Sequence, residues 1–342
     1  MQVEQTFTEE LSVRLSRRKI IQAAGATALS ASAGSRASMP SPRAEGKDTP
    51  KICLEAGTGS LAAGTIEEAG LRRIKQLGVD QVLTGGGRIP WEESRLKELM
   101  DKLKSGGLTL GNLMIVGFPN AIYGRPARDA DIEKVIQSIR VAGRIGLPVV
   151  EYNWYAHRAM EGYYEETGRA GAGMTAFDYE RMKDLPPLPE EGAQALETMW
   201  STLTYFLKAV IPVAEQVGVR LALHPNDPPA PLSRGSGQIM ATVEGWKRLI
   251  EIVKSPSNGI TFDCGVTREM GHDPVEVCRY FGSRDRINHV HFRNVKVRKP
   301  YEKLLFVSKI GVPGRTQGAA LRSSGTEAGR HRSPRPAMRH SP

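Results

Sequence analysis

Leu221-Ala222-Leu223-His224-Pro225-Asn226-Asp227-Pro228-Pro229 decides the fold, because it shows a strand that stops at a histidine. The apolar run before His224 has the length of a buried strand, and neither Pro228 nor Pro229 can lie inside one. The chain must therefore leave the sheet directly after His224. The stretch predicts either a structural histidine or an imidazole presented at the mouth of a cavity, and the rest of the chain favours the second.

From Lys51 onward, short apolar runs alternate with longer amphipathic patterns. Strands are predicted at 52–55, 79–83, 108–116, 149–152, 219–223, 260–262 and 287–295, and helices at 65–77, 92–105, 129–145, 191–217, 242–253 and 274–281. This alternation predicts an α/β fold, a (β/α)8 TIM barrel of which about seven strands are encoded and the eighth is missing. A doubly wound sheet is the alternative, but Gly57-Thr58-Gly59 lacks the third glycine of a dinucleotide-binding turn.

A long segment at 156–190 interrupts the alternation. It is rich in Gly, Tyr, Glu and Pro, and carries no clear period. Loops of this length within a compact domain usually have a function, so we expect this insertion to lie beside the site.

The charge of the chain is concentrated at its two ends. The net charge is +10, of which residues 1–50 carry +2 and residues 308–342 carry +6, so the segment 51–307 is nearly neutral. A nucleic-acid-binding domain needs a basic face, and this segment offers none. Three cysteines are too few for a disulfide framework.

The N-terminal residues 1–37 resemble an export signal. Arg17 and Arg18 precede an Ala/Gly-rich apolar stretch, and small residues near Ala33 or Ala37 offer a cleavage site. This order predicts a twin-arginine signal and an exported, periplasmic protein, with a cytoplasmic protein as the alternative. The apolar stretch is too short to span a membrane, so no stable membrane insertion is expected. Residues 38–50 are predicted to be a linker and residues 51–307 the barrel domain.

Polar side chains follow the predicted strands at their carboxyl ends, where the active site of a barrel lies. They are Glu55, Tyr152, Asn153, His224, Asp263, Cys264, His289, His291, Arg293 and Asn294. Imidazole, carboxylate and thiolate groups bind divalent metals. Since His224, Asp263 or Cys264, and His291 stand on consecutive strands, the sequence predicts a metal site. The period-two alternation of a strand places His289, His291 and Arg293 on one face.

Several motifs resemble the mannonate dehydratase family over roughly residues 51–303. They are Tyr205–Glu215, Leu223–Pro229, Ser255–Phe262 and His291–Lys296, together with Phe177–Glu180 and Tyr152-Asn153. The resemblance implies a xylose-isomerase-like TIM barrel that dehydrates D-mannonate or a related aldonate to 2-keto-3-deoxy-D-gluconate. It implies a divalent cofactor, with Mn expected and Fe or another divalent ion as alternatives. His224 and His291 would be metal ligands, and Tyr152, Asn153, Arg293 and Asn294 would lie near the substrate. Arg293 as a structural ion-pair partner is the alternative.

Two departures from the family pattern stand out. The family places a metal-binding cysteine after the phenylalanine that ends the predicted strand at 260–262. Here Asp263 takes that position and Cys264 follows it, so Asp263 is the preferred ligand and Cys264 the alternative. After Tyr301 the family would supply a further acidic ligand, catalytic His and Tyr residues and the eighth strand. Residues 308–342 instead predict a disordered basic tail, so the catalytic residues stay unknown.

The composition of this tail also indicates a truncated or frame-shifted gene product with impaired activity. A reading frame downstream of codon 303 that restores Asp, His and Tyr would support that account.

The leading expectation is therefore a metal-dependent sugar-acid lyase of hexuronate degradation, acting on a small molecule and forming homo-oligomers. A sugar isomerase or epimerase on the same barrel is the first alternative. An inactive exported sugar-binding remnant is the second.

Overall fold

The computed structural model describes residues 50–56 and 68–306, and it contains a curled parallel sheet. In the described residues the sheet has seven strands in the order β1 (Cys53–Glu55), β2 (Gln81–Gly85), β3 (Thr109–Ile115), β4 (Val149–Tyr152), β7 (Arg220–Leu223), β10 (Asn258–Asp263) and β11 (Ile287–His291). Every neighbouring pair is parallel. The order follows the chain, so the described residues form the incomplete (β/α)8 barrel that the sequence predicts.

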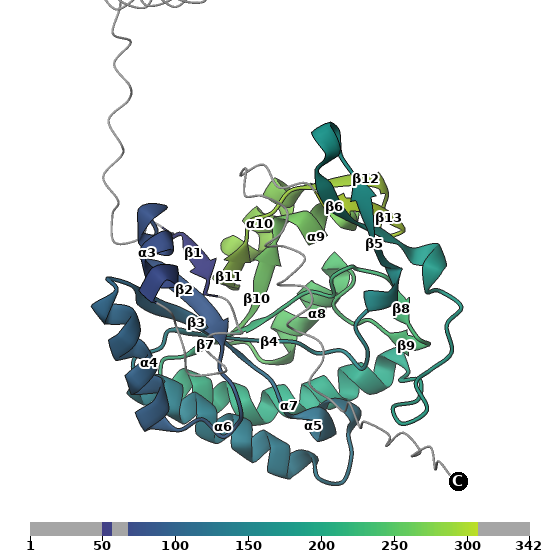
Figure 1. Ribbon diagram of the computed structural model, residues 1–342. Coiled ribbons are helices and arrows are strands. Elements are labelled where there is room, and N and C mark those ends of the chain that lie inside the picture. The colour runs from purple at the N-terminus through teal and green to yellow at the C-terminus, as the bar shows by residue number, and fades with distance from the viewer. Residues whose placement is uncertain (1–49, 57–67, 307–342) are drawn as a thin grey trace, which may run out of the picture. The chain divides into compact units, whose positions relative to one another are not determined.

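Helices connect successive strands and cover the outer side of the sheet (Figure 1). They are α3 (Glu68–Gln76), α4 (Glu93–Ser105), α5 (Pro119–Tyr123), α6 (Arg128–Arg144), α7 (Leu196–Gln216), α8 (Val243–Ile252), α9 (Cys264–Glu269) and α10 (Pro274–Gly282). Gly218 has a positive φ of 71° directly after α7, the conformation that ends a helix at little cost for glycine. Thr242 caps α8 by accepting a hydrogen bond from the Gly245 amide at 3.0 Å.

The main core lies between this sheet and its helices. All six residues of β10 are buried, as expected for a parallel strand covered on both faces. Aromatic side chains of α7 and of the strand ends pack together, with Phe206 4.8 Å from Trp154 and 5.7 Å from Tyr152 between ring centroids. This core fixes the strand ends that carry the candidate site.

A second, antiparallel sheet was missed by sequence reasoning. It consists of β5 (Tyr163–Thr167), β6 (Gly173–Asp178), β12 (Val295–Lys299) and β13 (Lys303–Phe306), in the order β12-β13-β6-β5. Short 3-10 turns at Met160–Gly162, Arg169–Gly171 and Tyr179–Arg181 flank its strands, and a two-stranded ribbon, β8 (Leu232–Ser233) with β9 (Ser236–Gly237), lies elsewhere in the chain. Buried Phe177 and Leu304 belong to a small core of the four-stranded sheet, separate from the main core. Much of the insertion at 156–190 is therefore ordered sheet.

The predicted strand at 287–295 is wrong in its second half. β11 ends at His291, and Val295 begins β12, which pairs with β13 in the second sheet. Arg293 thus lies between two strands of different sheets and does not continue the face that carries His289 and His291. The period-two alternation of β11 does not extend to Arg293, because the chain passes from the first sheet to the second between His291 and Val295.

The predicted signal at 1–37, the linker at 38–50 except for Pro50, and the tail at 308–342 lie outside the described residues and stay predictions. So does Thr65, the predicted start of the first helix. Within the described part, no helix is both long and apolar enough to cross a membrane.

Candidate metal centre

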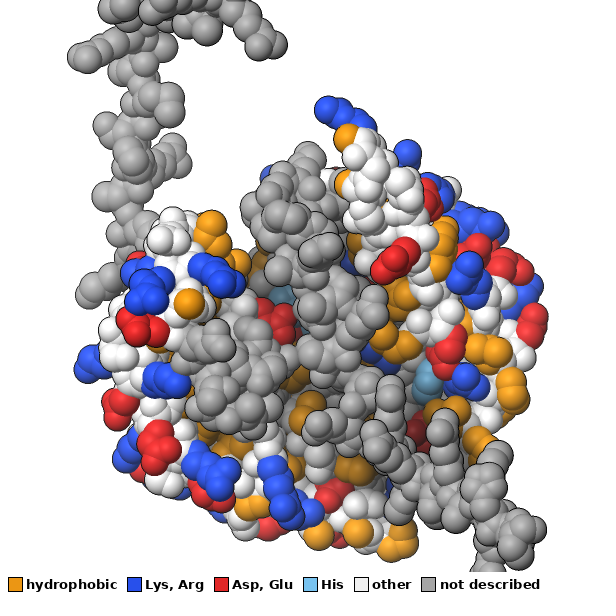
Figure 2. Space-filling view, in the orientation of Figure 1, with side chains coloured by type: hydrophobic (Ala, Val, Ile, Leu, Met, Phe, Trp, Pro, Cys, Tyr) orange, Lys and Arg blue, Asp and Glu red, His pale blue; other side chains and the backbone are white. Residues whose placement is uncertain are grey.

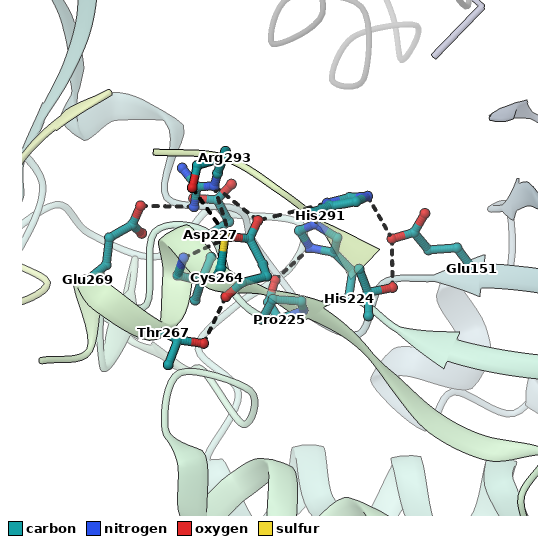
Figure 3. A network of polar contacts seen from close by, with 12 residues as sticks. Glu151, His224, Pro225, Asp227, Cys264, Thr267, Glu269, His291 and Arg293 are labelled. Atoms are coloured by element: carbon teal, nitrogen blue, oxygen red, sulfur yellow. Dashed lines mark hydrogen bonds and ion pairs between the residues drawn. The ribbon is translucent and has the colours of Figure 1, made fainter. Parts of the chain in front are cut away.

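Three parallel strands deliver His224, Asp263 and His291 to one place. His224 follows β7 directly, and Asp263 and His291 are the last residues of β10 and β11. Asp263 and His291 are also partners in the register of these two strands. The carboxyl ends of neighbouring parallel strands meet at one edge, so the three side chains converge, as Figure 3 shows for the two histidines.

The backbone fixes the tautomer of His224. Its Nδ1 lies 2.7 Å from the carbonyl oxygen of Pro225, and a carbonyl oxygen can only accept a hydrogen bond. The proton of neutral His224 is therefore on Nδ1, and Nε2 presents a lone pair. That Nε2 atom lies 3.0 Å from Nδ1 of His291.

The three donor atoms lie close enough together to hold a cation between them. The Nδ1 atom of His291 lies 3.8 Å from Asp263 Oδ2, and the ligand atoms of His224, Asp263 and His291 all lie within 4.8 Å of one another. A neutral His291 carries its proton either on Nδ1, between the two imidazoles, or on Nε2, and only the second form leaves both facing nitrogens free to hold a cation. Two imidazoles and a carboxylate form a donor set for Mn, Fe or Zn, so these residues fit a divalent metal.

Glu151 is a member of the site that sequence reasoning missed. It lies inside β4 and is completely buried. Its carboxylate accepts hydrogen bonds from Asn112 Nδ2 at 3.1 Å and from Thr261 Oγ1 at 2.8 Å, and its Oε1 lies 3.4 Å from His291 Nε2. Glu151, His289 and His291 form a second close group of potential ligands. An acidic residue in the apolar run Val149-Val150-Glu151-Tyr152 was the available signal.

The electrostatics of the site lower the pKa values of both Glu151 and His224. Burial raises the pKa of Glu151, but the nearby histidines, His291 first, outweigh burial and hold the pKa below its ordinary value. Burial lowers the pKa of His224, and His291 lowers it further against the opposing effect of Glu151. A neutral imidazole is the form that binds metal.

Arg293 belongs to a buried ion-pair network that includes Asp263, and Figure 3 shows Arg293 together with Asp227 and Glu269. Its Nε lies 2.9 Å from Asp263 Oδ2, and its Nη2 lies 3.0 Å from Asp227 Oδ1 and 2.8 Å from Glu269 Oε1. Burial raises the pKa of Glu269 well above its ordinary value despite the opposing effect of Arg293. These contacts correspond to the ion-pair alternative for Arg293, which holds the Asp263 carboxylate in place.

The structure separates Asp263 from Cys264. Asp263 is 1% exposed, and its Oδ1 caps α9 by accepting from the Val266 amide at 2.8 Å. Cys264 is the first residue of α9, and its thiol lies 3.1 Å from the carbonyl oxygen of Arg293. Burial raises the pKa of this thiol, which disfavours the thiolate that a metal requires. The geometry favours Asp263 over Cys264 as the ligand.

The remaining predicted residues lie around the site and not in it. The Tyr152 ring packs against Phe206 on the helix side of the sheet, because Tyr152 and Glu151 alternate across the two faces of β4. Asn153 Nδ2 donates to Met114 Sδ at 3.5 Å. Asn294 is half-buried between β11 and β12. Contact of these side chains with substrate stays a prediction.

Fold and site together define a class: an α/β-barrel protein with a candidate divalent-metal centre at its carboxyl edge. Within that class the family is shown by sequence. A family model described as D-mannonate dehydratase (UxuA) matches residues 63–195 and 190–320. The chain belongs to the D-mannonate dehydratase family.

Relatives and a solved structure agree with this family. The chain is 30% identical over 236 residues to a mannonate dehydratase of Streptococcus agalactiae serotype V, a match that covers 60% of this chain and 66% of the relative. It is 31% identical to a mannonate dehydratase of Thermotoga petrophila over 66% of this chain and 73% of the relative. The chain thus spans about two thirds of the length of these relatives. The crystal structure of mannonate dehydratase from Streptococcus suis serotype 2 superposes with a TM-score of 0.67 and 26% identity, covering 80% of this chain and 82% of that one.

Proposed function

We propose that this chain is a metal-dependent hydro-lyase that dehydrates D-mannonate, or a related aldonate, to 2-keto-3-deoxy-D-gluconate. The observation that carries the proposal is the convergence of His224 Nε2, His291 Nδ1 and Asp263 Oδ2 at three strand ends. Family membership supplies the reaction class, and the relatives named mannonate dehydratase supply the substrate.

His224, Asp263 and His291 would hold the metal, and we expect Mn, with Fe as the alternative. Nitrogen and oxygen donors without a thiolate suit these ions. A divalent ion supplies Lewis-acid stabilisation of the charge that develops on a sugar-acid carboxylate when the adjacent proton is removed. Arg293 keeps the Asp263 carboxylate at the end of β10, and the Pro225 carbonyl keeps Nε2 of His224 unprotonated.

The proposal includes reduced turnover. Loss of hydroxide from an aldonate needs a general acid, and the resemblance implies that a His, a Tyr and a further acidic ligand follow Tyr301. Residues 308–342 contain no Asp and no Tyr.

A second candidate is a sugar isomerase or epimerase that uses the same metal to polarise a carbonyl group. Asp263 at the position of the expected cysteine, together with the buried Glu151, gives a centre richer in carboxylates than the family pattern. A carboxylate-rich centre is compatible with carbonyl chemistry on a neutral sugar.

The test is a product assay on the purified full chain with Mn²⁺. D-mannonate and a panel of related aldonates and ketoses are supplied, and the products are identified by mass and NMR. A 2-keto-3-deoxy acid, two hydrogens and one oxygen lighter than its substrate, supports the lyase, and an isomeric sugar of unchanged mass supports the second candidate. His224→Ala is the matched inactive control. If no substrate is turned over at any Mn²⁺ concentration, the catalytic proposal is wrong.

A further inference from the structure

We propose that Glu151 is a positioning residue that sets the tautomer of His291 and thereby aims the His291 Nδ1 lone pair at the cation. This inference rests on the proposed metal centre, but it concerns a residue that does not itself bind the metal. It assigns a role to the buried carboxylate at the centre of the barrel.

The burial of a carboxylate at position 151 indicates a role for this side chain in the site. Its side chain is fully buried, and an isolated buried carboxylate is costly. Asn112 on β3 and Thr261 on β10 donate to its two oxygens from strands on either side of β4. These two hydrogen bonds fix the plane of the carboxylate and leave Oε1 facing the His291 ring, as the dashed line in Figure 3 indicates.

The two ring nitrogens of His291 have different neighbours. Nδ1 points toward His224 Nε2 at 3.0 Å and Asp263 Oδ2 at 3.8 Å, and Nε2 points toward Glu151 Oε1 at 3.4 Å. A neutral imidazole carries one N–H. A proton on Nε2 is donated to Glu151 and leaves the Nδ1 lone pair for a cation. A proton on Nδ1 would block the metal and would set the Nε2 lone pair against the carboxylate.

A carboxylate that accepts from the free nitrogen of a metal-binding histidine is a general device for fixing the ring and raising its basicity. Removing such a partner typically weakens metal binding 10- to 100-fold. For His224 the carbonyl oxygen of Pro225 has this role. For His291 the corresponding group is the carboxylate of Glu151, whose Oε1 lies 3.4 Å from Nε2.

The surroundings of Glu151 allow a sharp set of variants. The Oδ1 atom of Asn112 is buried and has no hydrogen-bond partner among the described residues, so the Asn112 amide can rotate. Glu151→Gln can then keep an oxygen toward His291 and Thr261 and turn its amide group toward the Asn112 oxygen. Glu151→Met has a similar length and offers no acceptor.

The experiment measures Mn²⁺ affinity of the full chain by electron paramagnetic resonance of the free ion. We expect Glu151→Met to bind about 10- to 100-fold more weakly than the wild type, and Glu151→Gln to lose much less. Equal affinity of Glu151→Met and the wild type overturns the proposal. An equally large loss in both variants also overturns it, because that result identifies a metal ligand, for which an amide is a poor substitute.

A second readout needs no metal. In ¹⁵N-histidine-labelled, metal-free protein, the His291 signal, assigned with His291→Gln, should show a protonated Nε2 in the wild type and an unprotonated Nε2 in Glu151→Met. An unchanged signal contradicts the inference whether or not the wild type binds Mn²⁺. If the wild type shows the expected tautomer but binds no metal, the proposed function fails and the positioning role of Glu151 survives.

Two further variants control for stability. Ser138→Ala removes a buried hydroxyl that bonds the Trp91 amide on another part of the barrel, and should leave Mn²⁺ affinity and the His291 signal unchanged. Thr261→Val removes the hydroxyl that fixes Glu151 Oε1 and should weaken Mn²⁺ binding in the same direction as Glu151→Met. It decides the question if Glu151→Met does not fold, and an unchanged affinity in Thr261→Val would then count against the proposal.

Discussion

At the scale of single residues, the site combines histidines whose partners differ in kind. His224 is fixed by the backbone of Pro225, whereas His291 faces the Glu151 side chain. His289 has a buried Nε2 without a hydrogen-bond partner in the described part of the chain. Burial lowers the pKa of His289 from 6.5 to about 4, against the opposing effect of Glu151. Burial thus lowers the pKa of His224 and of His289 and favours their neutral forms.

The depressed pKa of His289 predicts a dependence of stability on pH. The folded state disfavours the protonated ring, so its contribution is complete above the unfolded pKa of about 6.5 and is lost as pH falls toward 4. The two pKa values correspond to roughly 3 kcal/mol, of which about 2 kcal/mol is lost by pH 5. His289→Gln should therefore reduce the fall in unfolding free energy between pH 7 and pH 5, measured by urea titration.

The control for this prediction is His272→Gln, which removes an exposed histidine. If His289→Gln and the wild type lose the same free energy between the two pH values, His289 is not held neutral in the fold.

The candidate ligands could be predicted from sequence because each stands at or near the carboxyl end of a strand that the sequence predicts. His224, Asp263 and His291 are of this kind. Glu151 could not be predicted in the same way, because its partners Asn112 and Thr261 lie 39 and 110 residues away in the chain. The ion pairs of Arg293 were hidden for the same reason. These ion pairs depend on the path of the backbone after β11, which places the Arg293 side chain.

At the scale of elements, the sequence predicts the parallel strands and their helices well and the second sheet not at all. Buried strands and amphipathic helices are local patterns, and the cap at Thr242 confirms one boundary. The second sheet depends on pairing between Leu305 and Ala176, residues that are far apart in sequence. No short-range pattern carries that information.

Close approach of α6 to the end of α7 gives a prediction at this scale. A Cβ at Gly143 would lie 2.5 Å from Val217 Cβ and 2.9 Å from the Val217 carbonyl oxygen. Alanine is a better helix former than glycine by about 1 kcal/mol, but the overlap should outweigh this gain. Gly143→Ala should lower the unfolding free energy by about 1–3 kcal/mol, measured by urea unfolding.

Gly70 in α3 is the matched control, because no atom of the described residues lies within 4 Å of a Cβ at that position. Gly70→Ala should raise the unfolding free energy by about 0.5–1 kcal/mol. Equal effects of the two substitutions would show that helix propensity, and not packing of α6 on α7, decides the outcome.

At the scale of the whole described domain, the barrel keeps two unpaired edges. Among the described strands, none pairs with the outer edge of β1 or of β11, and the exposed Phe292 follows β11. Open edges favour association, and the homo-oligomer stays a prediction. On the face in Figure 2, basic and acidic side chains are interspersed, as expected for a nearly neutral domain.

Binding of a cation by three strands should stabilise the domain as a whole. A ligand at 100 times its dissociation constant adds about 2.7 kcal/mol to the unfolding free energy. Mn²⁺ should therefore raise the melting temperature by several degrees, measured by differential scanning calorimetry.

In His224→Ala this Mn²⁺-dependent rise should disappear, whereas His272→Ala should keep it. A rise of equal size in His224→Ala would place the bound ion elsewhere in the chain.

The hydrogen bond from His224 to the Pro225 carbonyl also bears on how the site tolerates genetic change. Every amino acid has a backbone carbonyl, so a substitution at position 225 leaves that acceptor in place as long as the loop keeps its course. The acceptor proposed for His291 is a side chain, and a single codon change can remove it. The two histidines would therefore differ in how they tolerate mutation. A single substitution at position 151 can change metal binding far more readily than one at position 225.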